Sequence, residues 1–172
     1  MKSPQPPHEP FNIVFHGHSI PCGYTTNHVV RQADAYPRLV HDALSARFPL
    51  AVINCITSGI GGECAIAGAR RMESVLAHRP RLLTVDYARN DMYHPLDENR
   101  AAWRRIIEAA FAVGSLVMLV TPAPDCGSLY YDPAQRKSSD EALAQMIRAL
   151  AAEYGVACAD AAAAFDRLFA QG

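Results

Sequence analysis

The sequence has no uninterrupted apolar run long enough to span a bilayer, and charge of neither sign dominates it. Its 172 residues carry 16 Lys and Arg against 17 Asp and Glu, a formal net charge of -1. Without a basic excess, nucleic acid and an anionic membrane are poor partner predictions. Residues 1–10 are polar and rich in proline and lack the apolar stretch of a signal peptide. We therefore expect a disordered leader over residues 1–10 and no membrane partner.

Cysteine is sparse and shows no pairing pattern. An odd number of scattered cysteines argues against a disulfide framework, and no two of them have the spacing of a zinc knuckle. The five are Cys22, Cys55, Cys64, Cys126 and Cys158. We expect reduced thiols in a cytoplasmic protein, with no metal and no cofactor.

Short apolar runs alternate along the chain with segments of helical periodicity. The runs cover residues 13–15, 51–55, 82–87, 116–121 and 156–159, and the helical segments cover 36–48, 63–78, 98–113, 139–154 and 161–169. This alternation predicts a parallel sheet with helices on both faces, a three-layer α/β/α sandwich. The length suits one domain, residues 11–172, and we prefer a flavodoxin-like strand order, 2-1-3-4-5.

The first apolar run stops abruptly at a serine. It is followed by His16-Gly17-His18-Ser19, where Gly17 permits a sharp turn and a close approach to a ligand. A serine just past such a strand lies at the carboxyl edge of the sheet, where ligands of open α/β sheets bind. Ser19 is therefore a candidate nucleophile, and the alternative is a serine that stabilises a turn or caps a helix.

A glycine-rich loop follows the second run and opens a helix. Its backbone N–H groups could hold a phosphate or the oxyanion of a tetrahedral intermediate. The loop is not a P-loop, because no Gly-Lys-Ser/Thr follows it. Gly59 and Gly61 of this loop are candidate substrate contacts. The alternative is simply a tight connection between strand and helix.

Asn90 and Asp91 follow the third run. The side-chain amide of Asn90 is a neutral donor suited to an oxyanion, although Asn at a strand end is often a turn or cap residue. Asp91 is a candidate substrate contact, but we favour a structural role, in which it caps the next turn or orients a neighbour.

Taken together, these segments resemble the SGNH subgroup of the GDSL hydrolase family. His16-Gly17-His18-Ser19-Ile20 is similar to the Gly-Asp-Ser nucleophile motif, Gly59-Ile60-Gly61-Gly62-Glu63 to the glycine loop, and Ala88-Arg89-Asn90-Asp91 to the Gly-x-Asn-Asp motif. The resemblance runs from Phe11 to about Phe169. It implies that Ser19 attacks an ester carbonyl, while the N–H groups of Ser19 and Gly62 and the amide of Asn90 hold the oxyanion. Gly62 fits the family's oxyanion glycine best, and Gly59 is the fallback.

The sequence departs from the family pattern in two places, the acid that supports the turn of the nucleophile motif and the histidine that serves as general base. His18 replaces the acid of the nucleophile motif, and it could keep a hydrogen-bonding role or alter the charge near Ser19. Adjacency alone does not make it the general base, because neighbours in a chain rarely point at each other. The resemblance also implies an Asp-x-x-His motif near the C-terminus, yet no histidine follows His94. Either the sequence is incomplete, or catalysis is weak, or another histidine substitutes, of which His94 is nearest to Asn90.

The resemblance implies a serine esterase that acts on a small acyl ester, including the O-acetyl groups of sugars. Lysophospholipase or thioesterase chemistry, a binding module without a catalytic histidine, and a phosphate binder using the glycine loop are the alternatives. We expect the loops 24–35 and 125–137 to wall the substrate pocket. Tyr130 is a candidate substrate contact that could stack on a sugar ring or serve only in packing.

Overall fold

The computed structural model describes residues 9–25, 27, 29–123 and 133–171, and the side chains of 133–138 are not described. Five parallel strands form one sheet in the order β2-β1-β3-β4-β5, as predicted. Most of the predicted leader lies outside the described residues. The strands are β1 (Phe11–Gly17), β2 (Ile53–Gly59), β3 (Leu82–Asp86), β4 (Leu116–Val120) and β5 (Ala157–Ala159).

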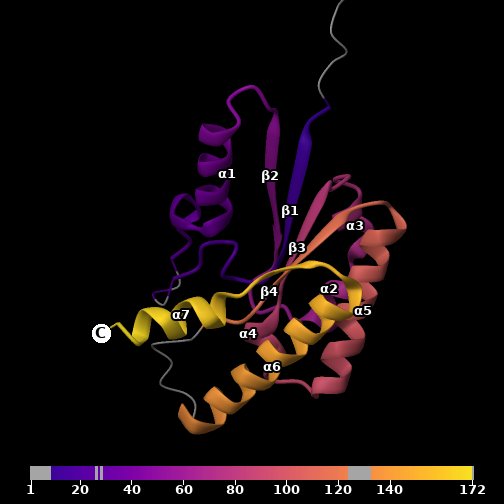
Figure 1. Ribbon diagram of the computed structural model, residues 1–172. Helices are drawn as coiled ribbons and strands as arrows, with labels where there is room; N and C mark the ends of the chain where they lie inside the picture. The colour runs from indigo at the N-terminus through magenta and orange to yellow at the C-terminus, as the bar shows by residue number, and fades with distance from the viewer. Residues whose placement is uncertain (1–8, 26, 28, 124–132, 172) are drawn as a thin grey trace, which may run out of the picture.

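Helices cover both faces of this sheet, which confirms the three-layer α/β/α sandwich (Figure 1). In the figure, α1 and α7 lie on one side of the strands and α2, α3 and α5 on the other. The helices are α1 (Tyr36–Arg47), α2 (Ala65–Arg70), α3 (Met72–Leu76), α4 (Ala88–Asp91), α5 (Leu96–Ala112), α6 (Pro133–Tyr154) and α7 (Ala161–Phe169), with a 3-10 turn at Gln32–Asp34. Within the described residues, no helix is both long and apolar enough to cross a membrane.

The main apolar core lies between the sheet and helices α2, α3, α5 and α6. Alternate strand residues point into it, so Val14 belongs to this core. Its neighbour Phe15 faces α1 and packs edge-on against Tyr36, with ring centroids 5.7 Å apart. Trp103 of α5 is fully buried in the core, and burial of one such side chain stabilises the fold by about 1.5–3 kcal/mol.

Most boundaries shift by one to six residues from the sequence predictions, and the short helix α4 was not predicted; two of the differences bear on the site. The second strand extends to Gly59, because Gly17 and Gly59 are still paired in register there. The helix predicted over 63–78 is divided into α2 and α3 at Arg71, whose backbone leaves the helical region at φ -105° and ψ 17°. The Arg71 guanidinium turns back to Ser58 and Glu63, and these bonds hold the break in place.

Candidate active site

The carboxyl ends of three adjacent strands, β2, β1 and β3, lie side by side at one edge of the sheet. Gly17 is paired with Gly59 on one side and with Asp86 on the other. A Cβ atom at Gly17 would lie 2.5 Å from the carbonyl oxygen of Asp86, so only glycine fits this close approach. The Ile60 N–H also donates to the Gly17 carbonyl at 3.1 Å. The three loops singled out in the sequence therefore leave the sheet side by side.

Ser19 lies in the turn that follows β1. The Tyr24 N–H donates to its carbonyl at 3.1 Å, and the Gly23 N–H donates to the Ile20 carbonyl at 2.9 Å. The serine is partly exposed, whereas His18 before it is fully buried. Ser19 Oγ is 3.3 Å from His18 Nδ1. The nucleophile candidate thus contacts a buried imidazole next to it in the chain.

His18 also lies next to Asp86, which sequence analysis did not single out. The distance from His18 Nε2 to Asp86 Oδ1 is 3.4 Å, and the side chains are 0% and 8% exposed. The Tyr36 hydroxyl donates to the other carboxylate oxygen, Oδ2, at 3.0 Å. Burial, together with the charge of Asp86, raises the pKa of Tyr36, so its hydroxyl keeps the proton that it donates. The one sequence feature that could have pointed to Asp86 is its position, as an acid at the end of a predicted apolar strand.

The glycine loop turns tightly between β2 and α2. The Glu63 N–H donates to the Ile60 carbonyl at 3.1 Å, which closes a turn around Gly61 and Gly62. Gly62 has φ +78°, a conformation that other residues adopt only with strain. Both glycines are exposed, and among the described residues no acceptor binds the N–H of Gly62. Gly59, by contrast, packs tightly against Cys22 and is half-buried.

A polar network beneath this loop holds it in place. The Arg71 guanidinium donates to the Glu63 carboxylate at 2.6–2.9 Å and to the Ser58 hydroxyl and carbonyl at 2.8 Å. The Tyr87 hydroxyl donates to Glu63 at 2.9 Å and lies 3.1 Å from His16 Nδ1. Burial, assisted by the charge of Arg71, lowers the pKa of His16 to about 3, so this ring is neutral. His16 is therefore part of the support of the loop.

Asn90 links the turn after β3 to the glycine loop. It lies in α4, a four-residue helix that begins directly after Tyr87. Its Nδ2 atom donates to the Glu63 carbonyl at 2.8 Å. An amide nitrogen carries two hydrogens, so this bond leaves one N–H of the partly exposed Asn90 side chain for a ligand.

Asp91 is fully buried, and its carboxylate is bound within the protein. Oδ1 accepts from the Ala65 N–H at 2.7 Å, and Oδ2 accepts from Trp103 Nε1 at 2.6 Å. Burial raises the pKa of Asp91 to about 6, although these two donors act in the opposite direction. The contacts join α2, α4 and α5 and support the structural role over a substrate contact.

Two further candidates from the sequence are the substrate contact Tyr130 and the substitute base His94. Tyr130 lies outside the described residues, as does most of the expected pocket wall at 125–137. His94 is exposed, and its main chain binds Asp91 and Asn99. In the part of the chain that the structure describes, no group of three His, Cys, Asp or Glu side chains could hold a metal ion.

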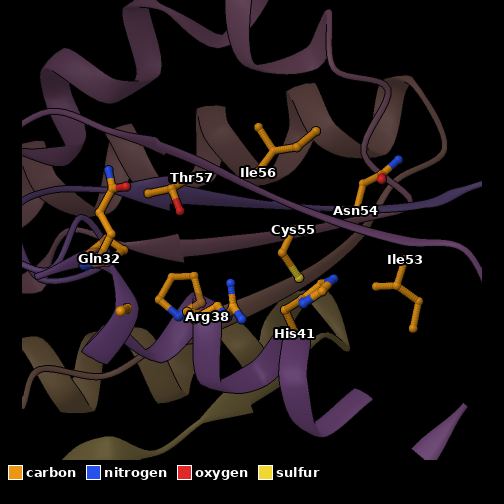
Figure 2. Close-up of a pocket in the computed structure, with 11 residues that line it drawn as sticks. Gln32, Arg38, His41, Ile53, Asn54, Cys55, Ile56 and Thr57 are labelled. Carbon is orange, nitrogen blue, oxygen red and sulfur yellow. The ribbon is translucent and has the colours of Figure 1, made fainter. Parts of the chain in front are cut away.

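A pocket of about 840 Å³ lies between α1 and β2 (Figure 2). Arg38 and His41 line it from the helix, and Cys55 and Thr57 line it from the strand. Ser19, Gly62 and Asn90 are not among its lining residues. This cavity therefore contains none of the three candidate catalytic residues, although Pro21 of the turn that holds Ser19 also lines it.

Comparison with known proteins places the chain in a family. Residues 15–171 match the GDSL-like Lipase/Acylhydrolase family. The structure is similar to an acetyl xylan esterase from Geobacillus stearothermophilus, Axe2, with a TM-score of 0.76 and 21% identity over 92% of this chain and 80% of that one. It is also similar to AlinE4, an SGNH-hydrolase family esterase, with a TM-score of 0.70 and 21% identity over 88% and 76% of the two chains.

A third similar structure is the esterase EstA from Pseudoalteromonas sp., with a TM-score of 0.66 and 16% identity over 87% of this chain and 76% of that one. No curated protein matches the chain. At these identities the solved structures establish the fold, and the family match establishes the relationship. The chain belongs to the GDSL-like lipase/acylhydrolase family, whose SGNH-hydrolase fold it shares.

Proposed function

We propose that this protein is a serine esterase that hydrolyses small acyl esters through an acyl-enzyme on Ser19. The observation that supports it most strongly is the pairing of Gly17 with both Gly59 and Asp86, which gathers the serine turn, the glycine loop and the Asn90 turn at one edge. Ser19 Oγ is partly exposed there and contacts an imidazole nitrogen. A serine needs such a neighbour, because its hydroxyl is a weak nucleophile by itself.

The oxyanion formed in this reaction needs hydrogen-bond donors already in position. We assign that role to the N–H groups of Ser19 and Gly62 and to the side-chain amide of Asn90. The exposed turn at Gly62 and the bond from Asn90 to the Glu63 carbonyl support this assignment, since both orient N–H groups before substrate arrives. Gly61 is the candidate substrate contact in this turn, and Gly59 is a supporting residue behind it.

The substrate class that we propose is a short-chain ester, with sugar O-acetyl groups as the natural form. The similar structure of an acetyl xylan esterase supports this choice at the level of the fold. Tyr24 is exposed, and its ring lies near Gly61, where a Cβ atom would be 3.5 Å from the ring. An exposed aromatic ring beside the oxyanion loop is a surface on which a sugar could stack.

Hydrolysis of p-nitrophenyl acetate by wild type, Ser19→Ala and Ser45→Ala tests the proposal. Ser45 is an exposed serine on α1 and serves as the matched control. We expect Ser19→Ala to lose activity and Ser45→Ala to keep it, and acetate to be turned over faster than octanoate. Full activity in Ser19→Ala would overturn the assignment of the site. Binding of esters without turnover by wild type would favour a non-catalytic binding module.

A further inference from the structure

We propose that His18, oriented by Asp86, is the general base for Ser19, so that two consecutive residues act as nucleophile and base. The inference rests on the proposed esterase function and names the group that takes the serine proton. Three observations carry it: the 3.3 Å contact between His18 Nδ1 and Ser19 Oγ, the 3.4 Å approach of His18 Nε2 to Asp86, and the complete burial of the ring.

The backbone around His18 shows which ring nitrogen carries no hydrogen and can therefore act as the base. The Ile20 N–H donates to His18 Nδ1 at 3.3 Å. Because a backbone N–H can only donate, Nδ1 carries no hydrogen in the neutral ring. The hydrogen therefore resides on Nε2, the nitrogen that faces Asp86 Oδ1. Nδ1 has a single lone pair, which the Ile20 N–H and Ser19 Oγ approach at the same distance of 3.3 Å. When Nδ1 takes the serine proton, its bond from Ile20 is given up.

Consecutive residues can meet here because the strand ends before them. In an extended strand, adjacent side chains point to opposite faces of the sheet. β1 ends at Gly17, and the chain enters the turn of residues 18–23, where this alternation no longer holds. The buried ring of His18 then lies 3.3 Å from the hydroxyl of the partly exposed Ser19.

Asp86 is placed to hold this ring and to balance its charge. The Tyr36 hydroxyl occupies Oδ2, which leaves Oδ1 for His18. The 3.4 Å separation is longer than an ordinary N–H···O bond, and His18 Nε2 has no hydrogen-bond partner at that distance. Catalytic hydrogen bonds are often long without substrate and shorten in the reactive complex. An imidazolium formed between Ser19 and Asp86 would be stabilised by this buried carboxylate.

His18 Nδ1 takes a proton and gives it back in each half of the reaction. Ser19 Oγ forms a bond to the ester carbonyl carbon, its proton passes to His18 Nδ1, and the carbonyl electron pair moves onto the oxygen. When the oxyanion collapses, the bond to the alcohol oxygen breaks, and that oxygen takes the proton from Nδ1. A water molecule then attacks the carbonyl carbon of the acyl-enzyme and gives one proton to Nδ1. The bond from that carbon to Ser19 Oγ breaks, Oγ takes the proton from Nδ1, and the acid leaves.

Other described histidines are placed less well for this role. His16 is bound to Tyr87, and burial lowers its pKa to about 3. His94 is exposed and joins Asn99 through its main chain. His41 lies in the pocket between α1 and β2, and His78 follows α3 at the opposite end of the sheet from Ser19.

The first test compares His18→Ala, Ser19→Ala and His78→Ala on p-nitrophenyl acetate, with and without added imidazole. We expect His18→Ala to lose ~100- to 10,000-fold in kcat, the range for removal of a general base, and to recover part of it with imidazole. Ser19→Ala should be inactive with or without imidazole, and His78→Ala should match wild type. If His18→Ala stays near wild type while Ser19→Ala is inactive, the esterase stands and this base assignment is wrong. If wild type and Ser19→Ala are equally inactive, both proposals fail.

A second variant and an NMR measurement distinguish loss of the base from loss of the folded structure. His18→Asn keeps an acceptor for the Ile20 N–H but removes the base, and we expect it to fold and to be as slow as His18→Ala. Nitrogen-15 NMR of wild type should show the His18 hydrogen on Nε2, and a hydrogen on Nδ1 would overturn the proposal. Asp86→Asn removes the buried carboxylate that would balance the charge of the imidazolium, so kcat should fall while KM stays unchanged. An unchanged kcat in Asp86→Asn would overturn the part of Asp86 in the relay.

Discussion

The side-chain amide of Asn90 donates to the main-chain carbonyl of Glu63 at 2.8 Å. This bond connects the turn after β3 to the glycine loop after β2, so two of the proposed oxyanion donors are positioned by one contact. Glu63 is itself held by Arg71 and Tyr87. The proposed site therefore depends on a buried polar network as much as on the residues that face substrate.

Replacement of Asn90 by alanine removes both a donor and this connection. We expect kcat on p-nitrophenyl acetate to fall ~100- to 1,000-fold, the usual cost of losing one oxyanion donor. Asn54→Ala is the matched control, because Asn54 is an exposed residue of β2 that binds Asn12. Equal activity of Asn90→Ala and Asn54→Ala would remove Asn90 from the site.

Gly62→Ala separates backbone strain from catalysis when it is compared with Gly114→Ala. The two glycines have φ +78° and +76°, and an added Cβ would meet no atom within 4 Å at either position. Each alanine should destabilise the fold by about 1–2 kcal/mol in urea unfolding, because L-residues are strained at positive φ. Only Gly62→Ala should also slow hydrolysis, by up to ~100-fold, since it displaces a donor. An equal loss of activity in both variants would show a general effect on folding.

Arg71→Met should destabilise the protein strongly. The variant leaves the Glu63 carboxylate, whose side chain is 7% exposed, without its cation. Loss of one partner of a buried ion pair costs about 3–5 kcal/mol. Arg38→Met is the control, because its ion pair with Asp42 is more than half exposed and screened by solvent, so its loss should leave the free energy of unfolding nearly unchanged. Similar unfolding free energies for the two variants would contradict the role given to the network.

Asp91 should make stability fall as the pH rises through the weakly acidic range. Its folded pKa of about 6 lies above the ordinary value of 3.8, so the folded state binds this proton more tightly than the unfolded state does. The stabilisation that this proton provides is complete below about pH 4 and is lost as the pH rises through 6. The free energy of unfolding changes by about 3 kcal/mol at most. The measurement is the free energy of unfolding of wild type minus that of Asp91→Asn, from pH 4 to 8, and this difference should fall as the pH rises. A difference that grows with pH would mean that Ala65 and Trp103 keep the carboxylate ionised instead.

The strand order could be predicted because the apolar runs and the helical segments alternate with few interruptions. The run at 82–87 matches β3 almost to the residue, and the order 2-1-3-4-5 follows from the fold class that such alternation favours. The break at Arg71 could not be predicted, since the apolar periodicity continues through it. It depends on bonds from Arg71 to Ser58 and Glu63, which are distant partners in the sequence.

The contact between His18 and Ser19 could not be predicted for a different reason. The sequence places them next to each other, but the direction of each side chain depends on the turn that begins after Gly17. Asp86 was not predicted as a site residue, because an acid near the end of an apolar run is usually just the point where a strand reaches solvent. Its role becomes visible only in the structure, where the pairing of Gly17 with Asp86 brings the carboxylate beside His18.

The most direct test of the proposed function is covalent labelling with phenylmethylsulfonyl fluoride, followed by intact mass and peptide mapping. We predict a single adduct on Ser19, formed in step with the loss of p-nitrophenyl acetate hydrolysis. Hydrolysis that continues unchanged after Ser19 is fully modified, or inactivation through an adduct on another residue, would contradict the assignment of Ser19 as the nucleophile.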